Sequence, residues 1–369
     1  MKILHINLNY KVSGIYKELN KVQLKDSDLD PTIWYPVNKS DEIKGEANNI
    51  FISKSLTKSD KFLFNTRKKK LINVYNNKMN DNYDLIHCHS LFSNGILGYE
   101  IAKQNEIPLI IAVRNTDINI FFKYFKHLKY QAIKALLYAK KIVLISHSYK
   151  EKFLSYIPIK YKKSISDKII IIPNGISDFW IENINDSETN KSKTFKLLTV
   201  GHIVKNKNQL NVAKAVKNIN DITGKVKIDY TIIGKVKDNS YFKKINNVLP
   251  DIKHLDQMPK EELIKHFRNS DLMILPSFKE TFGLAYIESI SQNIPVVTSK
   301  NQGIDKMFNS KFVRSVNPNS VDEIQNILMY FIDMKPYDLD GYKNLANNFS
   351  WANVNDQYKK IYTEVISNG

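Results

Sequence analysis

The sequence predicts an α/β protein made of two domains, each built on a parallel β-sheet. Short runs rich in β-branched residues alternate with longer amphipathic segments, a pattern typical of parallel strands joined by crossover helices. The chain has 369 residues, which is enough for two domains with a core each. A polar segment between the two sets of runs marks their boundary.

Five runs in the first half of the chain and four in the second are predicted as strands: residues 2–7, 84–87, 108–113, 141–146 and 168–173, then 196–201, 229–234, 271–276 and 295–298. Residues 177–193 are rich in Asn, Asp, Ser and Glu, which favours a linker. We therefore predict a first domain at 1–176, a second at 194–349, and a C-terminal segment at 350–369.

The single cysteine limits the redox chemistry of the chain. Cys88 lies in an apolar run, so an intrachain disulfide is impossible and a buried thiol in a reducing compartment is expected. The apolar run at residues 2–7 is too short for a signal peptide, and no window reaches the roughly 18 apolar residues of a membrane span. These features predict a cytoplasmic protein.

The positive charge is concentrated in the first half. Residues 1–180 carry 29 Lys and Arg against 16 Asp and Glu, whereas residues 181–369 carry 26 against 21. The excess indicates an anionic partner such as a membrane surface, an acidic acceptor or a nucleic acid, although the Lys-rich and Asn-rich composition of an AT-rich genome would look the same. No nucleic-acid-binding motif is recognised, so no nucleic-acid partner is expected.

Residues 118–141 contribute to this excess as a predicted basic amphipathic helix. Two interpretations remain open: a helix that lies on a membrane surface, and a core-packing helix whose lysines extend to solvent. The residues of the apolar face are Phe121, Phe125, Leu128, Ala132 and Leu136, and the lysines around it are Lys123, Lys126, Lys129, Lys134 and Lys140.

Two glutamates follow the predicted strand at 271–276. Glu280 lies in the loop at the carboxyl edge of the strand, and Glu288 lies about one turn into the next helix. Gly283 between them permits close approach of a ligand, and the helix N-terminus attracts phosphate. Two carboxylates around an anion site suit a sugar nucleotide, and two solvated glutamates on an ordinary helix are the alternative.

The segment from Glu280 to Glu288 resembles the E-x7-E element of the retaining glycosyltransferases of the GT-B fold, family 4. Residues 171–176 resemble the "IPNG" turn of that family, residues 200–208 its "VGRL..EKG" loop, and residues 292–298 its "G.PVV" strand. The motifs follow the family's order over nearly the whole chain. The resemblance implies two Rossmann-like domains that face each other across a cleft, with a last helix near 351–366 that packs on the first domain.

The resemblance also implies roles for individual side chains of the second domain. Glu288 is expected to bind the ribose hydroxyls, Glu280 the hydroxyls of the donor sugar, and Lys207 the charge of the leaving diphosphate. His202 stands where the family usually has an arginine, and Lys205 is either a substitute cation or a solvated charge. The other expected donor contacts are Thr281, Phe282, Gly283, Leu284, Gly234 and Met258.

In the first domain, Arg114 takes a position where the family commonly has a histidine. Its guanidinium suits a phosphate or donor contact, so Arg114 joins Glu280 and Lys207 as an expected catalytic residue. His89, Asn115 and Asp117 are the acceptor-side candidates. Gly14 is either part of a phosphate loop or a structural turn glycine. The His-x-His pair that ends at His89 lacks further ligands, so no metal site is predicted.

The expected reaction is retaining and metal-independent. In this family a donor phosphate oxygen receives the acceptor proton during front-face attack, so the two glutamates are not a nucleophile and acid pair as in glycosidases. No Asp-x-Asp pair follows a strand in a loop, and Lys207 with a helix dipole would carry the leaving-group charge instead. No cofactor is expected.

The predicted function is the transfer of a hexosyl or N-acetylhexosaminyl group from a nucleoside-diphosphate-sugar, UDP in preference to GDP, to a glycan or lipid-linked acceptor. The expected setting is bacterial surface polysaccharide synthesis in the cytoplasm, at the inner face of the membrane. An NDP-sugar 2-epimerase on the same fold is one alternative. The other alternative is a catalytically inactive GT-B-like binding protein. It is favoured by Arg114 and His202, the two residues that differ from the family pattern.

Overall fold

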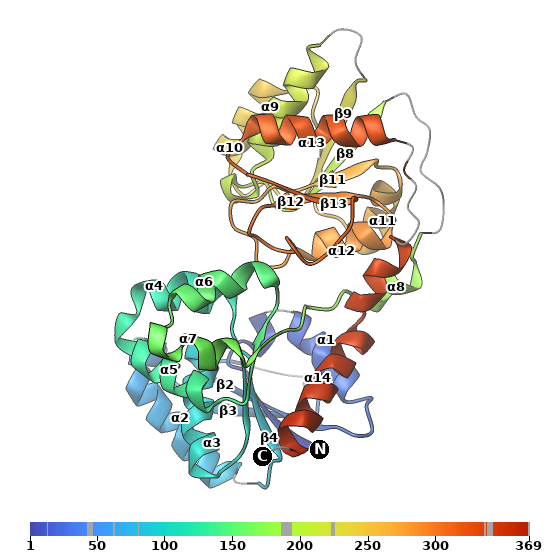
Figure 1. Ribbon diagram of the computed structural model, residues 1–369. Helices are drawn as coiled ribbons and strands as arrows, with labels where there is room; N and C mark the ends of the chain where they lie inside the picture. Colours follow the sequence, from blue (N-terminus) through green and yellow to red (C-terminus); the bar gives the residue numbers. More distant parts are fainter. Residues whose placement is uncertain are drawn as a thin grey trace. The chain divides into compact units, whose positions relative to one another are not determined.

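The computed structural model divides into two compact units (Figure 1). Unit 1 comprises Met1–Ile145, Lys150–Gly175 and Trp351–Gly369, and unit 2 comprises Ser146–Tyr149 and Ile176–Ser350. The structure describes residues 1–367 except 13, 43–46, 62, 80, 186–193, 223–225, 336 and 338–341. Each unit contains one parallel sheet, so the predicted fold class is confirmed.

The sheet of unit 1 has seven parallel strands in the order β3-β2-β1-β4-β5-β6-β7. The strands are β1 (Lys2–Ile6), β2 (Asp30–Asn38), β3 (Ile50–Leu56), β4 (Leu85–Cys88), β5 (Leu109–Ala112), β6 (Lys141–Leu144) and β7 (Ile169–Ile171). The helical segments include α1 (Gly14–Gln23), α2 (Phe64–Lys78), α3 (Ile96–Gln104), η4 (Asp117–Phe121), α4 (Phe122–Tyr124), η5 (Lys126–Leu128), α5 (Lys129–Tyr138), α6 (Lys150–Ser155), α7 (Ile159–Ser166) and α14 (Trp351–Ser367).

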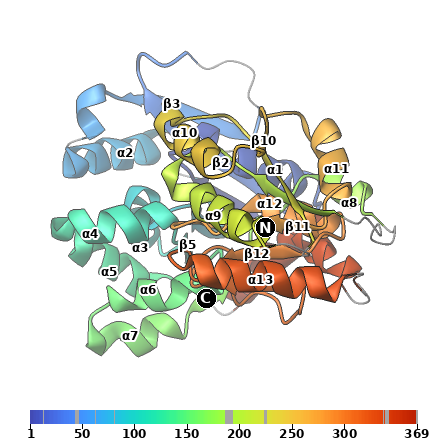
Figure 2. The same cartoon turned by 90° about the horizontal axis from the view of Figure 1, so that it is seen from above.

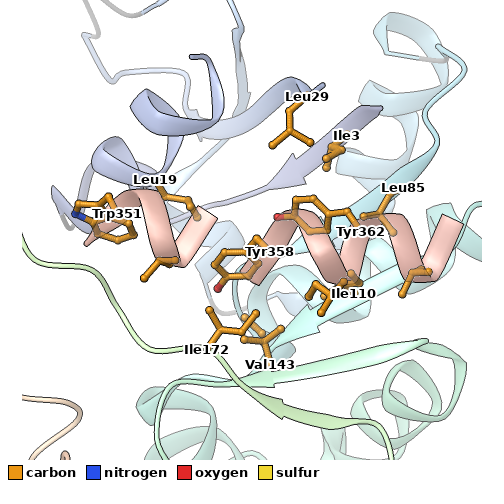
Figure 3. Packing of buried hydrophobic residues seen from close by; sticks show 14 residues of the cluster. Ile3, Leu19, Leu29, Leu85, Ile110, Val143, Ile172, Trp351, Tyr358 and Tyr362 are labelled. Carbon is orange, nitrogen blue, oxygen red and sulfur yellow. The ribbon is translucent and has the colours of Figure 1, made fainter. Parts of the chain in front are cut away.

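Helix α14 returns from the far end of the chain to cover the sheet of unit 1. Its buried side chains recur at helical spacing, so one face is apolar. Tyr358 and Tyr362 pack on Ile3, Leu85 and Ile110 of three neighbouring strands (Figure 3). Each large apolar side chain buried there contributes roughly 1.5–3 kcal/mol, so this helix is part of the core of unit 1.

The start of α14 explains the glycine of the "IPNG" turn. A Cβ atom at Gly175 would lie 2.5 Å from the indole ring of Trp351. Trp351 is itself 2% exposed, so the ring has no free space into which it could move. The close approach of Gly175 therefore fixes where the chain returns to unit 1.

Unit 2 has a six-stranded parallel sheet in the order β10-β9-β8-β11-β12-β13. Helices α9 and α13 lie side by side on it (Figures 1 and 2). The strands are β8 (Phe195–Val200), β9 (Ile228–Ile233), β10 (Lys253–Leu255), β11 (Leu272–Ile274), β12 (Val296–Ser299) and β13 (Val313–Val316). The helices include α8 (Asp178–Glu182), η7 (Lys205–Lys207), α9 (Gln209–Asn220), α10 (Asn239–Val248), α11 (Lys260–Arg268), α12 (Leu284–Ser291) and α13 (Val321–Met334).

Two expectations from the sequence need correction. The interval 177–193 is not a linker throughout, because α8 forms at its start and Trp180 is buried in unit 2; residues 186–193 lie outside the described part. The segment 118–141 is not one helix, because the helical chain is interrupted at Phe125 before η5 and α5 follow. Leu128, Ala132 and Leu136 are buried, as expected for its apolar face, whereas Phe121 is half-buried and Phe125, which was assigned to the same face, is 39% exposed.

Strands β2, β3, β10 and β13 were not predicted. β2 contains Pro31 and Pro36, which weaken a strand pattern, and the other three are edge strands. Cys88 is buried without a disulfide, as predicted, and burial raises the pKa of its thiol.

Replacing Gly175 with Ala should destabilise unit 1 by about 1–3 kcal/mol, because the added methyl group overpacks against Trp351. The midpoint of urea unfolding, followed by tryptophan fluorescence, measures this loss. Gly14→Ala is the matched control, since a Cβ atom there meets nothing within 4 Å and alanine favours the first turn of α1. Equal midpoints for the two variants would contradict the packing argument.

Candidate active site

The candidate residues of unit 2 follow the order of its strands. Met258 comes after β10, Gly234 after β9, His202 and Lys207 after β8, and Glu280 after β11, and these four strands are neighbours in the sheet. Ligands of open parallel sheets bind beyond the carboxyl ends of the strands, at the point where the strand order reverses. That point lies between β8 and β11, where Lys207 and Glu280 are located.

Lys207 and Glu280 form an ion pair. The lysine Nζ lies 2.7 Å from Oε2 of Glu280, and the glutamate is 8% exposed. Ser277 donates its hydroxyl to the same oxygen at 3.3 Å, and the Thr281 amide donates to Oε1 at 3.0 Å. The site therefore holds a buried carboxylate and a half-buried ammonium group in contact.

Two asparagines fix the loops that carry this pair. The Asn206 side chain donates to the carbonyl of Lys279 at 2.9 Å, and the amide of Phe278 donates to the Asn206 carbonyl at 2.9 Å. Asn208, which adopts a left-handed conformation with φ 61°, donates to the carbonyl of Pro276 at 3.0 Å. Both asparagines belong to the motif at 200–208, yet their residue type alone did not indicate this role.

The N-terminus of α12 adjoins Glu280. Gly283 has φ +84°, and a side chain there would overlap the Tyr286 ring, so glycine is required. The first amides of α12 have no intrahelical acceptor, so they are able to donate hydrogen bonds to an anion. Thr281 and Leu284 are half-buried beside them, whereas Phe282 is buried against Phe349 with ring centroids 5.9 Å apart, so its backbone is its only route to a ligand.

Two residues beyond β12 hold the backbone of Glu280. The side-chain oxygen of Gln302 accepts a hydrogen bond from the Glu280 amide at 3.1 Å, and the Gly303 amide donates to the Glu280 carbonyl at 3.1 Å. Both residues were missed in the sequence. They could have been predicted from their position directly after the predicted strand at 295–298, because the carboxyl ends of parallel strands lie at the same edge of the sheet.

Glu288 is half-buried on α12 and is hydrogen-bonded to the Trp180 side chain. Burial raises the pKa of Glu288 to about 7, and the hydrogen bond from Trp180 opposes this rise. The indole N–H can only donate, so it stabilises the ionised carboxylate. Trp180 lay in the predicted linker and carried no sequence signal for this contact.

The ends of β8 and β9 are packed closely. A side chain at Gly234 would overlap the carbonyl of Gly201, and His254 contacts the Gly234 carbonyl through Nε2 at 2.9 Å. Met258 is half-buried before α11, and His202 is exposed. Because glycines stand at the ends of β8 and β9, the backbone and not a side chain lies at this edge of the sheet, where a nucleotide is expected.

The candidates of unit 1 lie beyond β4 and β5, except Gly14, which follows β1. Arg114 donates from Nε to the carbonyl of His89 at 3.1 Å, and its guanidinium lies over the Tyr16 ring at 5.7 Å. It also hydrogen-bonds to Tyr358 of α14, and the charges around it raise its pKa despite burial. Arg114 therefore connects three segments of unit 1: the loop after β4, helix α1 and helix α14.

The remaining unit 1 candidates differ in their surroundings. Asp117 is fully buried and accepts hydrogen bonds from the amides of Leu91, Phe92 and Arg114, so its carboxylate already orders the backbone around it; burial raises its pKa. His89 is buried, and Asn115 is half-buried. A side chain at Gly14 would meet nothing within 4 Å, so the fold sets no steric requirement for glycine there.

Comparison with known families identifies the chain. Residues 181–349 match the model for glycosyl transferases group 1, and residues 32–178 match the model for glycosyltransferase family 4. The chain belongs to the GT-B glycosyltransferases of this group 1 and family 4 type, and its activity is glycosyl transfer. In the described part of the chain, no helix combines the length and apolarity that a membrane crossing requires.

Individual relatives are distant but cover the chain. It is 23% identical over 410 residues to the UDP-Gal:alpha-D-GlcNAc-diphosphoundecaprenol alpha-1,3-galactosyltransferase of Escherichia coli, across 100% of this chain and 98% of that protein. The apo lipopolysaccharide outer core galactosyltransferase WaaB has a TM-score of 0.74 at 16% identity, covering 99% and 100% of the two chains. Anabaena HepE in complex with UDP-glucose has a TM-score of 0.66 at 14% identity, covering 99% and 100%.

If Glu288 accepts ribose hydroxyls, donor affinity should fall as the pH drops below about 7, because the carboxylate becomes protonated through its raised pKa of about 7. Each lower pH unit should weaken donor binding up to about tenfold, until the loss of one charged acceptor, roughly 1.5–3 kcal/mol, is complete. Isothermal titration calorimetry between pH 6 and pH 8 measures the effect.

Glu288→Gln should bind donor weakly at every pH in that range and lose the pH dependence. Glu323→Gln is the control, because Glu323 lies on α13 with a pKa below its ordinary value and stays ionised throughout the titration. Donor affinity that is unchanged in Glu288→Gln would remove this glutamate from the site.

Proposed function

We propose that the protein is a retaining, metal-independent glycosyltransferase that moves a hexosyl or N-acetylhexosaminyl group from a UDP-sugar to a glycan or lipid-linked acceptor in bacterial surface polysaccharide synthesis. The observation that carries the proposal is the Lys207–Glu280 pair beside the N-terminus of α12. This arrangement places a cation, a helix dipole and a carboxylate at the strand reversal, where a sugar diphosphate needs all three.

The names of the relatives support the choice of substrates. The Escherichia coli relative is named for UDP-galactose and a diphosphoundecaprenol-linked acceptor, and the HepE structure is of a UDP-glucose complex. Both favour a UDP-sugar as donor. The first supports a lipid-linked acceptor, which would be met at a membrane surface.

In the proposed reaction, Lys207 exchanges partners. The diphosphate of the donor takes the place of Glu280 at the ammonium group, and the freed Glu280 carboxylate accepts a hydroxyl of the donor sugar. The acceptor hydroxyl attacks the anomeric carbon from the side of the leaving group, its proton passes to the departing phosphate oxygen, and the C–O bond to phosphate breaks. Lys207 and the α12 amides stabilise the negative charge of the released UDP.

Lys207→Ala should lower turnover at least about a hundredfold, because it removes a preorganised charge from the leaving diphosphate. Sugar transfer from labelled UDP-sugars to lipid-linked and soluble glycan acceptors measures this loss. Lys205→Ala is the matched control, since Lys205 is exposed on the same loop, and it should stay within a few-fold of the parent. Near-normal turnover of Lys207→Ala would indicate that Lys205 or His202, and not Lys207, stabilises the charge of the leaving diphosphate.

The same assay separates transfer from epimerisation and from binding alone. Sugar transfer would be shown by a glycosylated product whose amount increases with the concentration of acceptor. Donor isomerised without acceptor would indicate an epimerase, and donor bound without any turnover would indicate a binding protein.

Transfer should continue in EDTA, because Lys207 and the α12 dipole supply the charge that Mg²⁺ or Mn²⁺ would otherwise supply. Initial rates measured with EDTA and with added Mg²⁺ or Mn²⁺ should agree within about twofold. Activity that disappears in EDTA and returns with Mg²⁺ or Mn²⁺ would show that the diphosphate needs a metal.

A surface of unit 1 supports action at a membrane. Four apolar or aromatic side chains are at least 39% exposed close together in sequence, and lysines lie among them. Exposed aromatics interleaved with lysines suit the interface of an anionic bilayer. We call these residues the 120–130 surface: Ile120, Lys123, Tyr124, Phe125, Lys126, Lys129 and Tyr130.

The protein should sediment with vesicles that contain anionic lipid and not with neutral vesicles, because each lysine near an anionic surface contributes about 1 kcal/mol before screening. Binding should weaken as salt is added. Replacing Lys123, Lys126 and Lys129 together with Gln should release the protein from the vesicles.

The control removes three exposed lysines of unit 2, Lys243, Lys244 and Lys265, and should leave vesicle binding intact. Equal recovery with anionic and neutral vesicles would indicate a soluble acceptor.

A further inference from the structure

Three histidines converge on the face of the unit 1 sheet that α14 covers. His5 on β1 and His87 on β4 are register partners in neighbouring parallel strands. His89 comes two residues after His87, and side chains two apart along an extended chain point to the same face. The fold thus adds His5, which is distant in sequence, to the His-x-His pair.

The three rings are close together and buried. Their centroids are 5.3 Å apart for His5 and His87, 5.2 Å for His5 and His89, and 4.3 Å for His87 and His89. One ring nitrogen from each residue lies within 4.8 Å of the others. No ring is more than 4% exposed.

The hydrogen bonds of the cluster leave three nitrogens unused. His5 Nδ1 lies 3.0 Å from His89 Nε2, and His87 Nδ1 lies 2.8 Å from the Tyr362 hydroxyl. Within the described part of the chain, His5 Nε2, His87 Nε2 and His89 Nδ1 are buried without a hydrogen-bond partner. A buried polar atom without a partner is costly, so each ring has one nitrogen whose hydrogen-bonding capacity the described protein groups leave unused.

We propose that His5, His87 and His89 form a transition-metal site, suited best to Zn²⁺, that joins β1 and β4 beneath α14. The site goes beyond the proposed donor chemistry, which is assigned to unit 2. Its burial fits a structural role, in which the metal holds two central strands together and fixes the last helix through Tyr362.

The chemistry of the three side chains fits such a metal. A neutral imidazole carries one ring N–H and one lone pair, so zinc would replace the hydrogen bond between His5 and His89 for each of the three rings to offer its lone pair. Imidazole favours Zn²⁺, Cu²⁺ and Ni²⁺ over Mg²⁺ and Ca²⁺. Bonds to zinc of about 2.0–2.1 Å require the nitrogens to move closer, which side-chain rotation supplies. The Tyr362 hydroxyl on His87 Nδ1 would orient that ring with Nε2 toward the metal.

The local charge sets a limit on affinity. The Arg114 guanidinium donates from Nε to the carbonyl of His89 at 3.1 Å, and a positive charge beside the cluster opposes the binding of a dication. The Asp117 carboxylate interacts with Arg114, and its negative charge offsets part of this repulsion. Because the three ligands themselves are uncharged, binding should be weaker than at sites with cysteine or carboxylate ligands.

The test uses the full chain with any affinity tag removed. After dialysis against a chelator, addition of Zn²⁺ should restore close to one zinc per chain by elemental analysis. It should also raise the Tm by about 5 °C or more at a hundredfold excess over the dissociation constant. Mg²⁺ should raise it much less, and Co²⁺ should give the ligand-field absorption of a tetrahedral site with three imidazoles and one water molecule as ligands.

Variants then assign the ligands. His5→Gln and His87→Gln should each lose the zinc and the Tm shift, Tyr362→Phe should weaken binding about 10–100-fold, and His127→Gln, which changes an exposed histidine, should behave as the parent. If the ligand variants do not fold, the zinc content per chain of the parent protein and its Tm shift on addition of Zn²⁺ still test whether the site exists. A parent that binds no zinc and shows no shift, or a shift kept in His5→Gln and His87→Gln, overturns the site and leaves a packing cluster.

This outcome is independent of the proposed function. Transfer lost in the chelator and restored by Zn²⁺ alone would report on unit 1 stability, and the response to Mg²⁺, Mn²⁺ and Lys207→Ala tests the donor chemistry separately.

Discussion

The ion pair between Lys207 and Glu280 is the interaction on which the arrangement of unit 2 depends. Taking a carboxylate out of water costs several kcal/mol unless a partner compensates, and Glu280 is compensated by one ammonium group, one hydroxyl and one amide. The pair therefore holds the loops after β8 and β11 together. A diphosphate can replace the carboxylate at the lysine, so the contact that stabilises the free protein also prepares the proposed donor site.

Unit 1 depends on a different constraint, the return of the chain as α14. The helix supplies the apolar cover for the central strands, and its two buried tyrosines reach polar groups beneath it: Tyr362 contacts His87, and Tyr358 contacts Arg114. Arg114, which follows β5, thus connects the loop after β4, α1 and α14.

Much of the fold followed from the sequence because buried parallel strands are short apolar runs with clear ends. The positions of Glu280 and Glu288 relative to β11 and α12 could be derived in the same way, since loop and helix follow the strand directly. Contacts between distant segments could not. Trp180 reaches Glu288, and His5 reaches His89, only because the sheets bring separate strands and helices together, and nothing local in either residue's surroundings indicates its partner.

The central claim, that Lys207 and Glu280 act as one unit on the donor, is tested most directly by a double-mutant cycle in kcat/KM for the UDP-sugar. Lys207→Ala, Glu280→Gln and the double variant are compared with the parent protein. We expect strong non-additivity, with a coupling energy of at least about 1 kcal/mol and a double variant little worse than the worse single variant. Losses that simply multiply would contradict it, because they would show that the two side chains act on the reaction independently.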